Sequence, residues 1–161
     1  MKKLYTSLAA GIIILGSITL SEAQIRTGTK EIGFSGSFAD HDGRTWQGSA
    51  YFGYFYNSHL EILGIGDFQG GSKRRDTGSI GPGIDWHFLT DKTTPEFLPY
   101  VGASYLVGLG RDMPDALEGH VGLKQFLTGK VAIKYQVGYG FDPSETSDST
   151  FRATIGLSYF F

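Results

Sequence analysis

The residues from 151 to 161 alternate strictly between two kinds of side chain, and this alternation constrains the fold more than any other feature of the sequence. One face is apolar throughout and carries Phe151, Ala153, Ile155, Leu157, Tyr159 and Phe161. The other face carries Arg152, Thr154, Gly156 and Ser158, followed by Phe160. Because successive side chains of an extended chain point to opposite sides, a period of two predicts a β-strand between an apolar and a polar environment.

The same period recurs in seven segments further upstream, and no long segment with a helical period follows residue 24. We therefore expect eight strands, over residues 30–38, 46–55, 59–69, 79–88, 99–109, 117–127, 131–141 and 151–161. Segment 59–69 is ambiguous in hydropathy, but Glu61 and Asp67 share a face with Leu63, which places that face inside. The predicted fold is all-β, an eight-stranded up-and-down antiparallel barrel. An even strand number returns both termini to one side.

The first residues form a segment of a different kind. Lys2 and Lys3 precede an apolar run over residues 8–20, and Ser21-Glu22-Ala23 places small residues where a cleavage site requires them. This pattern predicts a signal peptide over residues 1–23 and a barrel domain over residues 24–161. The alternative is a membrane anchor, which needs about 20 apolar residues to cross a bilayer as a helix.

Composition excludes several classes of protein. The chain contains no cysteine, so a disulfide framework is excluded, and its formal net charge of −2 gives no support to nucleic-acid binding. Pairs such as Gly64-x-Gly66 and Gly138-x-Gly140 lack the spacing and the following helix of a phosphate-binding loop. We expect no cofactor and no metal ion.

Aromatic residues gather toward both ends of the predicted strands. One end would carry Trp46, Phe68, Tyr139, Phe141 and Phe151, and the other Trp86, Phe88, Tyr159 and Phe161. Aromatic girdles at two levels are typical of a barrel that crosses a membrane with its apolar face outside. The alternative with the opposite polarity is a soluble periplasmic barrel that binds lipid inside.

Two segments resemble a known family. Alternate residues of the last strand, Ile155, Leu157, Tyr159 and Phe161, resemble the C-terminal signal that the outer-membrane barrel assembly machinery recognises. Gly53-Tyr54-Phe55, followed by Asn57 and Leu60, resembles a strand-turn-strand segment of the small OmpA/OmpX-type barrels. The resemblance covers residues 24–161. It implies a monomeric protein of the Gram-negative outer membrane, in contact with its lipids and lipopolysaccharide.

For function, the resemblance implies a structural or surface-interaction role through extracellular loops, without catalysis. The alternative is a small porin-like channel of low conductance. The predicted inner face carries ten ionisable residues: Glu31, Glu61, Asp67, Asp85, His87, Glu118, His120, Lys124, Lys134 and Arg152. An eight-stranded barrel is just wide enough for side chains to fill it, so we expect a salt-bridge network, with a narrow polar path for ions as the alternative. Asp85, His87 and Ser79 share a face, but this spacing is weak evidence for a hydrolase triad.

Lys73, Arg74 and Arg75 form the most basic run of the predicted outer loops. We hypothesise that they contact the phosphates of lipopolysaccharide, because guanidinium and ammonium groups bind phosphate through charge-assisted hydrogen bonds. Reversal of all three charges to Glu is then expected to weaken binding of purified lipopolysaccharide. Unchanged binding would contradict this contact.

Overall fold

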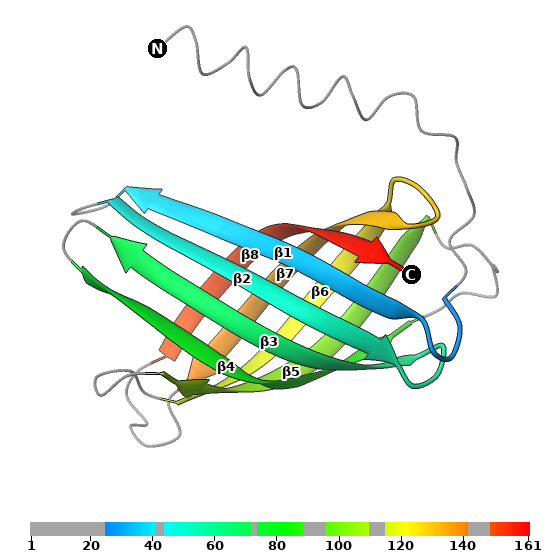
Figure 1. Ribbon diagram of the computed structural model, residues 1–161, viewed down its shortest axis with the longest axis horizontal. Helices are drawn as coiled ribbons and strands as arrows, with labels where there is room; N and C mark the ends of the chain where they lie inside the picture. The colour runs from blue at the N-terminus through cyan, green and yellow to red at the C-terminus, as the bar shows by residue number, and fades with distance from the viewer. Residues whose placement is uncertain (1–24, 41–43, 72–73, 89–95, 110–114, 142–148) are drawn as a thin grey trace, which may run out of the picture.

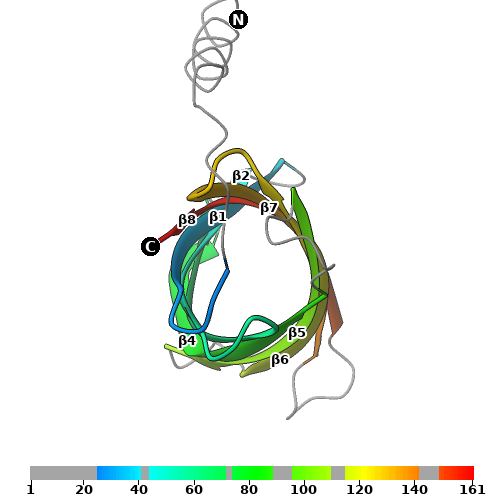
Figure 2. The same cartoon turned by 90° about the vertical axis from the view of Figure 1, so that its right-hand side faces the viewer.

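The structure is a computed structural model that describes residues 25–40, 44–71, 74–88, 96–109, 115–141 and 149–161. Eight strands follow one another along the chain: β1 (Lys30–Asp40), β2 (Arg44–Phe55), β3 (Leu60–Gly71), β4 (Arg74–His87), β5 (Phe97–Gly108), β6 (Ala116–Phe126), β7 (Val131–Phe141) and β8 (Ser149–Phe160). Each strand pairs antiparallel with its neighbours in sequence, and β1 pairs with β8 to close a barrel (Figures 1 and 2). The predicted up-and-down, eight-stranded barrel is confirmed.

The two ends of the barrel differ. Residues 56–59 and 127–130 make short turns at one end, where β1 begins and β8 finishes; we call this the turn end. At the opposite end, which we call the loop end, β1 ends and β2 begins (Figure 1). Within the part of the chain that the structure describes, no helix is long and apolar enough to cross a membrane.

Several strands are longer at the loop end than the sequence predicted. Residues 70–77 were expected to form a loop, but β3 continues to Gly71 and β4 begins at Arg74, with a register irregularity between Gln69 and Gly71. The placement of Arg74 and Arg75 in a loop is therefore wrong. Backbone hydrogen bonds extend a hairpin regardless of side-chain polarity, so the polar composition of this segment did not mark the end of pairing.

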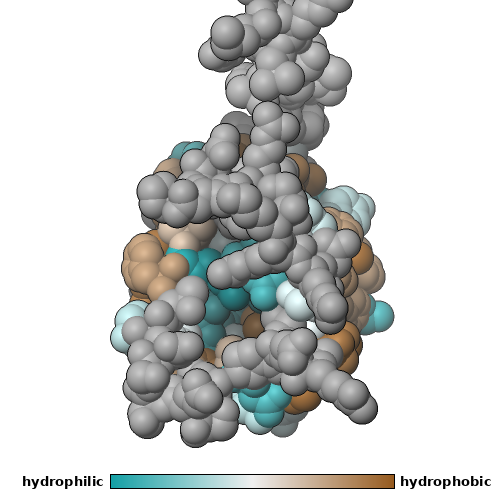
Figure 3. All heavy atoms as spheres, turned by 90° about the vertical axis from the view of Figure 1, so that its left-hand side faces the viewer, coloured by the Kyte–Doolittle hydropathy of each residue, from teal (hydrophilic) through white to brown (hydrophobic). Residues whose placement is uncertain are grey.

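The parity predicted for each strand is observed in the side chains that the structure describes. In β3, Glu61, Leu63 and Asp67 are buried inside the barrel, whereas Ile62 and Phe68 are about half exposed, at 48% and 50%. Large apolar side chains cover the outer wall of all eight strands. Seen from the loop end, hydrophilic atoms lie in the centre of the barrel and hydrophobic atoms on its flanks (Figure 3). The barrel is therefore polar inside and apolar outside.

An apolar cluster fills the barrel interior at the turn end, and the sequence did not predict it. Its buried members are Phe55, Leu98, Phe126, Ala132 and Phe160, with Ile25 packed against them. None of the five is more than 9% exposed. We call this cluster the apolar seal, because it occupies the lumen between the turns and the charged residues above it. Any path through the barrel would have to pass it.

Glycines on the inner wall provide the space that the polar side chains occupy. A methyl group at Gly102 would overlap the Oδ1 atom of Asp85 and the Nε2 atom of His120, and one at Gly53 would overlap the carboxylate of Glu61. The same relation holds for further pairs: Gly33 with Tyr51, Gly122 with Tyr100, and Gly138 with Glu118. A glycine on one strand thus leaves room for a bulky polar side chain from the neighbouring strand.

We predict that Gly102→Ala destabilises the barrel by about 1–3 kcal/mol, the usual cost of forcing extra atoms into a packed interior. Gly64→Ala is the matched control, because a methyl group there meets nothing within 4 Å on the outer wall; we expect a change within about 0.5 kcal/mol. Urea unfolding of both variants in detergent micelles measures the difference. Equal stability of the two variants would contradict the packing role of Gly102.

Candidate functional site

The ten ionisable residues predicted for the inner face all lie in the lumen. Nine of them are between 0% and 7% exposed, and the side chain of Arg152 is 25% exposed. They form three groups along the barrel axis: an inner group next to the apolar seal, a central group, and an outer group toward the loop end. Each group joins strands that lie far apart in the sequence.

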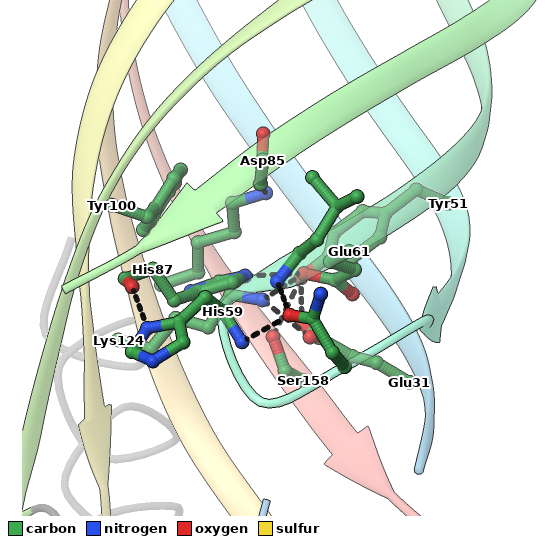
Figure 4. Close-up of polar contacts among 12 residues, drawn as sticks. Glu31, Tyr51, His59, Glu61, Asp85, His87, Tyr100, Lys124 and Ser158 are labelled. Carbon is green, nitrogen blue, oxygen red and sulfur yellow. Dashed lines mark hydrogen bonds and ion pairs between the residues drawn. The ribbon is translucent and has the colours of Figure 1, made fainter. Parts of the chain in front are cut away.

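The inner group is built around Lys124 of β6. Its ammonium donates hydrogen bonds to Glu31 of β1 and, over 2.8 Å, to the Oε2 atom of Glu61 on β3 (Figure 4). The Nε2 atom of His87 on β4 donates to the same Glu61 oxygen over 2.9 Å. Lys124, Glu31, Glu61 and His87 are all fully buried. Four strands are thus joined by charge-assisted hydrogen bonds, which are stronger than those between neutral groups.

Aromatic and hydroxyl groups complete the surroundings of this inner group. The hydroxyl of Tyr51 donates to the Oε1 atom of Glu31 over 2.6 Å, and Ser158 lies 2.6 Å from the same phenol oxygen. Three rings face the ammonium of Lys124 at centroid distances of 5.4–5.6 Å: Phe55, Tyr100 and Phe160. Rings at this range attract a cation through their quadrupole. The apolar seal and the charged group therefore share side chains.

The central group contains a third buried carboxylate. Asp85 of β4 accepts a hydrogen bond at Oδ1 from the Nε2 atom of His120 on β6, over 2.7 Å. Its Oδ2 atom lies 3.8 Å from the ammonium of Lys134 on β7. That ammonium also faces the rings of Tyr51 at 4.2 Å and Tyr100 at 5.0 Å. Side chains from opposite walls meet here and fill the middle of the lumen.

The outer group surrounds Arg152 of β8. Its guanidinium donates to the Oδ2 atom of Asp67 on β3 over 2.7 Å and lies 3.7 Å from Glu118 on β6. Glu118 also accepts a hydrogen bond from Gln136. These residues border a cavity of about 40 Å³. Since one water molecule needs roughly 10–15 Å³ by this measure, the outer lumen has room for a few waters.

One set of residues has the composition of a metal site. Glu61, Asp85 and His87 each offer a ligand atom, and these atoms lie within 4.8 Å of one another. The ammonium of Lys124 already binds Glu61, and that of Lys134 lies close to Asp85. Two cations of the chain itself therefore compensate these carboxylates, and we assign no metal to the set.

Asp85, His87 and Ser79 do not form the suspected hydrolase triad. His87 donates to Glu61, whereas Asp85 accepts from His120, so the two residues of the suspected triad have other partners. No hydrogen bond joins Ser79 to either histidine among the residues that the structure describes. The lumen therefore offers paired charges rather than an activated nucleophile.

Other predicted site residues fall elsewhere. Ile155, Leu157, Tyr159 and Phe161 are exposed on the outer wall of the last strand. Lys73 and the predicted signal peptide lie outside the described residues, as do the side chains of Arg74 and Arg75. The contact with lipopolysaccharide thus stays a prediction from the sequence.

Sequence reasoning missed four polar members of the network: Tyr51, Tyr100, Gln136 and Ser158. The alternation had placed them on the inner face, but only the barrel register shows which charged side chains they meet. Large aromatic residues on an otherwise polar inner face were the available signal. A buried phenol hydroxyl normally requires a hydrogen-bond partner.

Comparison with solved structures places the chain among small outer-membrane barrels by fold. The N-terminal β-barrel domain of Pseudomonas aeruginosa OprF matches with a TM-score of 0.62 at 16% identity, over 84% of this chain and 98% of that one. Neisserial surface protein A matches with a TM-score of 0.60 at 16% identity, over 83% of this chain and 96% of that one. The Yersinia pestis outer-membrane protein Ail matches with a TM-score of 0.55 at 14% identity, over 83% of this chain and 98% of that one. No family profile and no curated protein matches the chain.

The fold and the lumen together define a closed, eight-stranded antiparallel barrel with a charged interior and an apolar wall. Its structural neighbours are small bacterial outer-membrane barrels, which confirms the predicted resemblance at the level of the fold.

We predict that Lys124→Met destabilises the barrel by about 3–5 kcal/mol, because removing one partner leaves Glu31 and Glu61 buried without a counter-charge. Lys130→Met is the matched control, since Lys130 is exposed in a turn. The stability of both variants is measured in micelles as the urea concentration at the midpoint of unfolding, followed by tryptophan fluorescence. If the two variants unfold at the same midpoint, the Lys124 ion pairs do not hold the lumen together.

Proposed function

We propose that this protein is an integral outer-membrane barrel that does not conduct ions and acts through the parts it exposes at the loop end. The observation that carries this proposal is the polarity of the wall. Large apolar side chains that are more than a third exposed occur on every strand, among them Phe34, Phe52, Ile84, Val121 and Val137. A patch of this extent on a protein surface marks contact with a partner or a membrane.

The position of the aromatic residues supports insertion into a bilayer. Trp46, Phe68 and Tyr139 are exposed near the loop end, and Trp86 and Tyr159 near the turn end. Aromatic side chains prefer the two interfaces between lipid and water, where an apolar ring and a polar edge are both accommodated. Two girdles separated by an aliphatic belt are what a bilayer requires of a barrel.

The filled lumen argues against the channel alternative. The outer group borders a cavity together with His120 and Lys134, but hydrogen bonds and ion pairs join the inner and central groups across the barrel, and the apolar seal closes the turn end. An ion would have to displace Lys124 from two carboxylates and then pass between Phe55, Phe126 and Phe160. In a medium of low dielectric constant both steps are costly.

The soluble lipid-binding alternative requires an apolar cavity inside the barrel. The described lumen carries ten ionisable side chains, and two cavities in it are bordered by residues such as Asp67 and Arg152. An acyl chain would meet buried charges there. The apolar surface that a lipid would bind lies on the outer wall instead.

We expect the full-length protein to be recovered in the outer-membrane fraction and to migrate differently on a denaturing gel before and after boiling. Planar-bilayer recording of folded protein is expected to show no discrete conductance steps. Recovery in the soluble periplasm would contradict membrane insertion, and regular single-channel steps would favour the channel alternative.

The gel shift serves as the control for the electrical recording, because only folded barrels resist unfolding by detergent without heat. The absence of conductance steps therefore supports the proposal only for samples in which the unboiled protein migrates as the folded form. A porin reconstituted in parallel shows that the bilayer system detects conductance.

A further inference from the structure

The seam between β1 and β8 is paired along only part of its length. Its register pairs run from Glu31–Phe160 to Gly36–Ile155 and stop there. β1 continues to Asp40 and β8 begins at Ser149, so four residues of β1 and six of β8 have no partner across this seam. In each of the other seams, pairing reaches the loop-end terminus of at least one strand.

The figures agree with this register. β1 and β8 lie side by side at the turn end, where Lys30 and Phe161 exchange two backbone hydrogen bonds of 2.9 Å. Toward the loop end the two strands diverge (Figures 1 and 2). The unpaired residues of β1 stay paired with β2, and those of β8 with β7, so both are ordered strand edges.

The outer wall along this seam is unusually open. Among the described residues, the five most exposed large apolar side chains include Phe151 at 71%, Ile155 at 63% and Phe34 at 61%. Phe34 belongs to β1 and the other two belong to β8, so all three flank the seam. Phe151 has no neighbour across the seam, and Ile155 faces Gly36, which has no side chain to cover it. Phe34 lies between Leu157 and the small Ala50.

The lumen behind the open part of the seam is polar. The cavity of the outer group is bordered by Ser35 of β1 and by Arg152 and Thr154 of β8. Arg152 lies in the unpaired part of β8, and its guanidinium is held by Asp67 on β3, across the lumen. This ion pair links the unpaired part of β8 to the opposite wall.

Unpaired strand edges have a specific consequence in a membrane. Lipid supplies no hydrogen bonds, so an open sheet edge does not persist against the hydrocarbon region. Outside a membrane, an exposed edge is a template on which a further strand can add. This step rests on the proposed membrane insertion; in either setting the two edges can take a strand partner.

We propose that the open half of the β1–β8 seam is an interface between two copies of this chain. Two barrels with the same orientation, related by a two-fold axis parallel to their own axes, would place β1 of one copy against β8 of the other. The two strands would then run antiparallel, as they do within one barrel, and both open edges of each copy would be paired. Such an interface is isologous, the commonest kind in homodimers. Phe34, Phe151 and Ile155 of both copies would pack along it.

This interface departs from the monomer implied by the sequence resemblance. A second copy fits better than a lipid molecule, because only another strand supplies both donors and acceptors to the two edges. A lipid headgroup would also have to enter a cavity of about 40 Å³ whose arginine is already paired with carboxylates.

The chain contains no cysteine, so paired cysteines test the seam directly. Continued from Gly36–Ile155, the register would place Phe38 opposite Ala153. We expect full-length Phe38→Cys protein, mixed with Ala153→Cys protein in micelles or liposomes and oxidised, to form a disulfide-linked heterodimer. Wild-type protein is expected to sediment with twice the mass of one chain.

Two matched pairs control this experiment. Val137 and Ala153 are register partners within one chain, so the double variant Val137→Cys/Ala153→Cys should form an intrachain disulfide in every sample. Val101→Cys lies on the outer wall of β5, and its mixture with Ala153→Cys should give no covalent dimer, which excludes random collision.

Two outcomes would overturn the interface. An intrachain disulfide in the double variant Phe38→Cys/Ala153→Cys, together with monomer mass, would mean that each barrel closes its own seam. Monomer mass without any disulfide would mean that something other than a second copy covers the edges. Neither outcome bears on the proposed function, which membrane fractionation and bilayer recording test separately.

Discussion

The burial of the Lys124 ammonium between Glu31 and Glu61 is the interaction on which the rest of the lumen depends. An isolated charge in so enclosed a space would cost several kcal/mol, so the three groups are stable only together. They come from β6, β1 and β3, which lie on different walls of the barrel. The same contact therefore braces the barrel across its width and fills the space through which an ion would pass. The Lys124 ion pairs therefore both stabilise the barrel and close its lumen.

The two ends of the lumen follow from where charge and apolar surface meet. Phe55 and Phe160 face Lys124 from the turn end, and beyond them the interior contains no charged group among the residues that the structure describes. Toward the loop end, Arg152 is partly exposed and a cavity remains. The loop end of the lumen is therefore polar and partly open, and the turn end is apolar and filled.

Much of the fold could be predicted from the sequence because alternation fixes which face a side chain occupies. Glu61 and Asp67 set the parity of β3 even though Leu63 and Ile65 obscured its hydropathy. Alternation does not fix height along the barrel axis, which depends on the register of all eight strands. For this reason the contacts of Tyr51 and the space at Gly102 could not be foreseen.

The apolar seal was missed for a related reason. Leu98 stands between Phe97 and Pro99, where apolar residues run together and no alternation marks the inner one. The polar composition around Arg74 and Arg75 predicts a loop, whereas the hairpin of β3 and β4 continues past the apolar belt. Composition reports the environment of a strand, and backbone hydrogen bonds determine its length.

The chemistry of the lumen also governs where the barrel closes. At the turn end, Phe160 lies in the apolar seal, and burial of its ring holds β8 beside β1. Eight residues earlier in the same strand, Arg152 reaches across the lumen to Asp67 of β3 and Glu118 of β6, and the pairing of β8 with β1 is absent. Closure of a barrel joins its first and last strands, the contact most distant in sequence and therefore entropically the most costly. In this barrel that contact runs from the apolar seal to the pair Gly36–Ile155 and ends before it reaches Arg152.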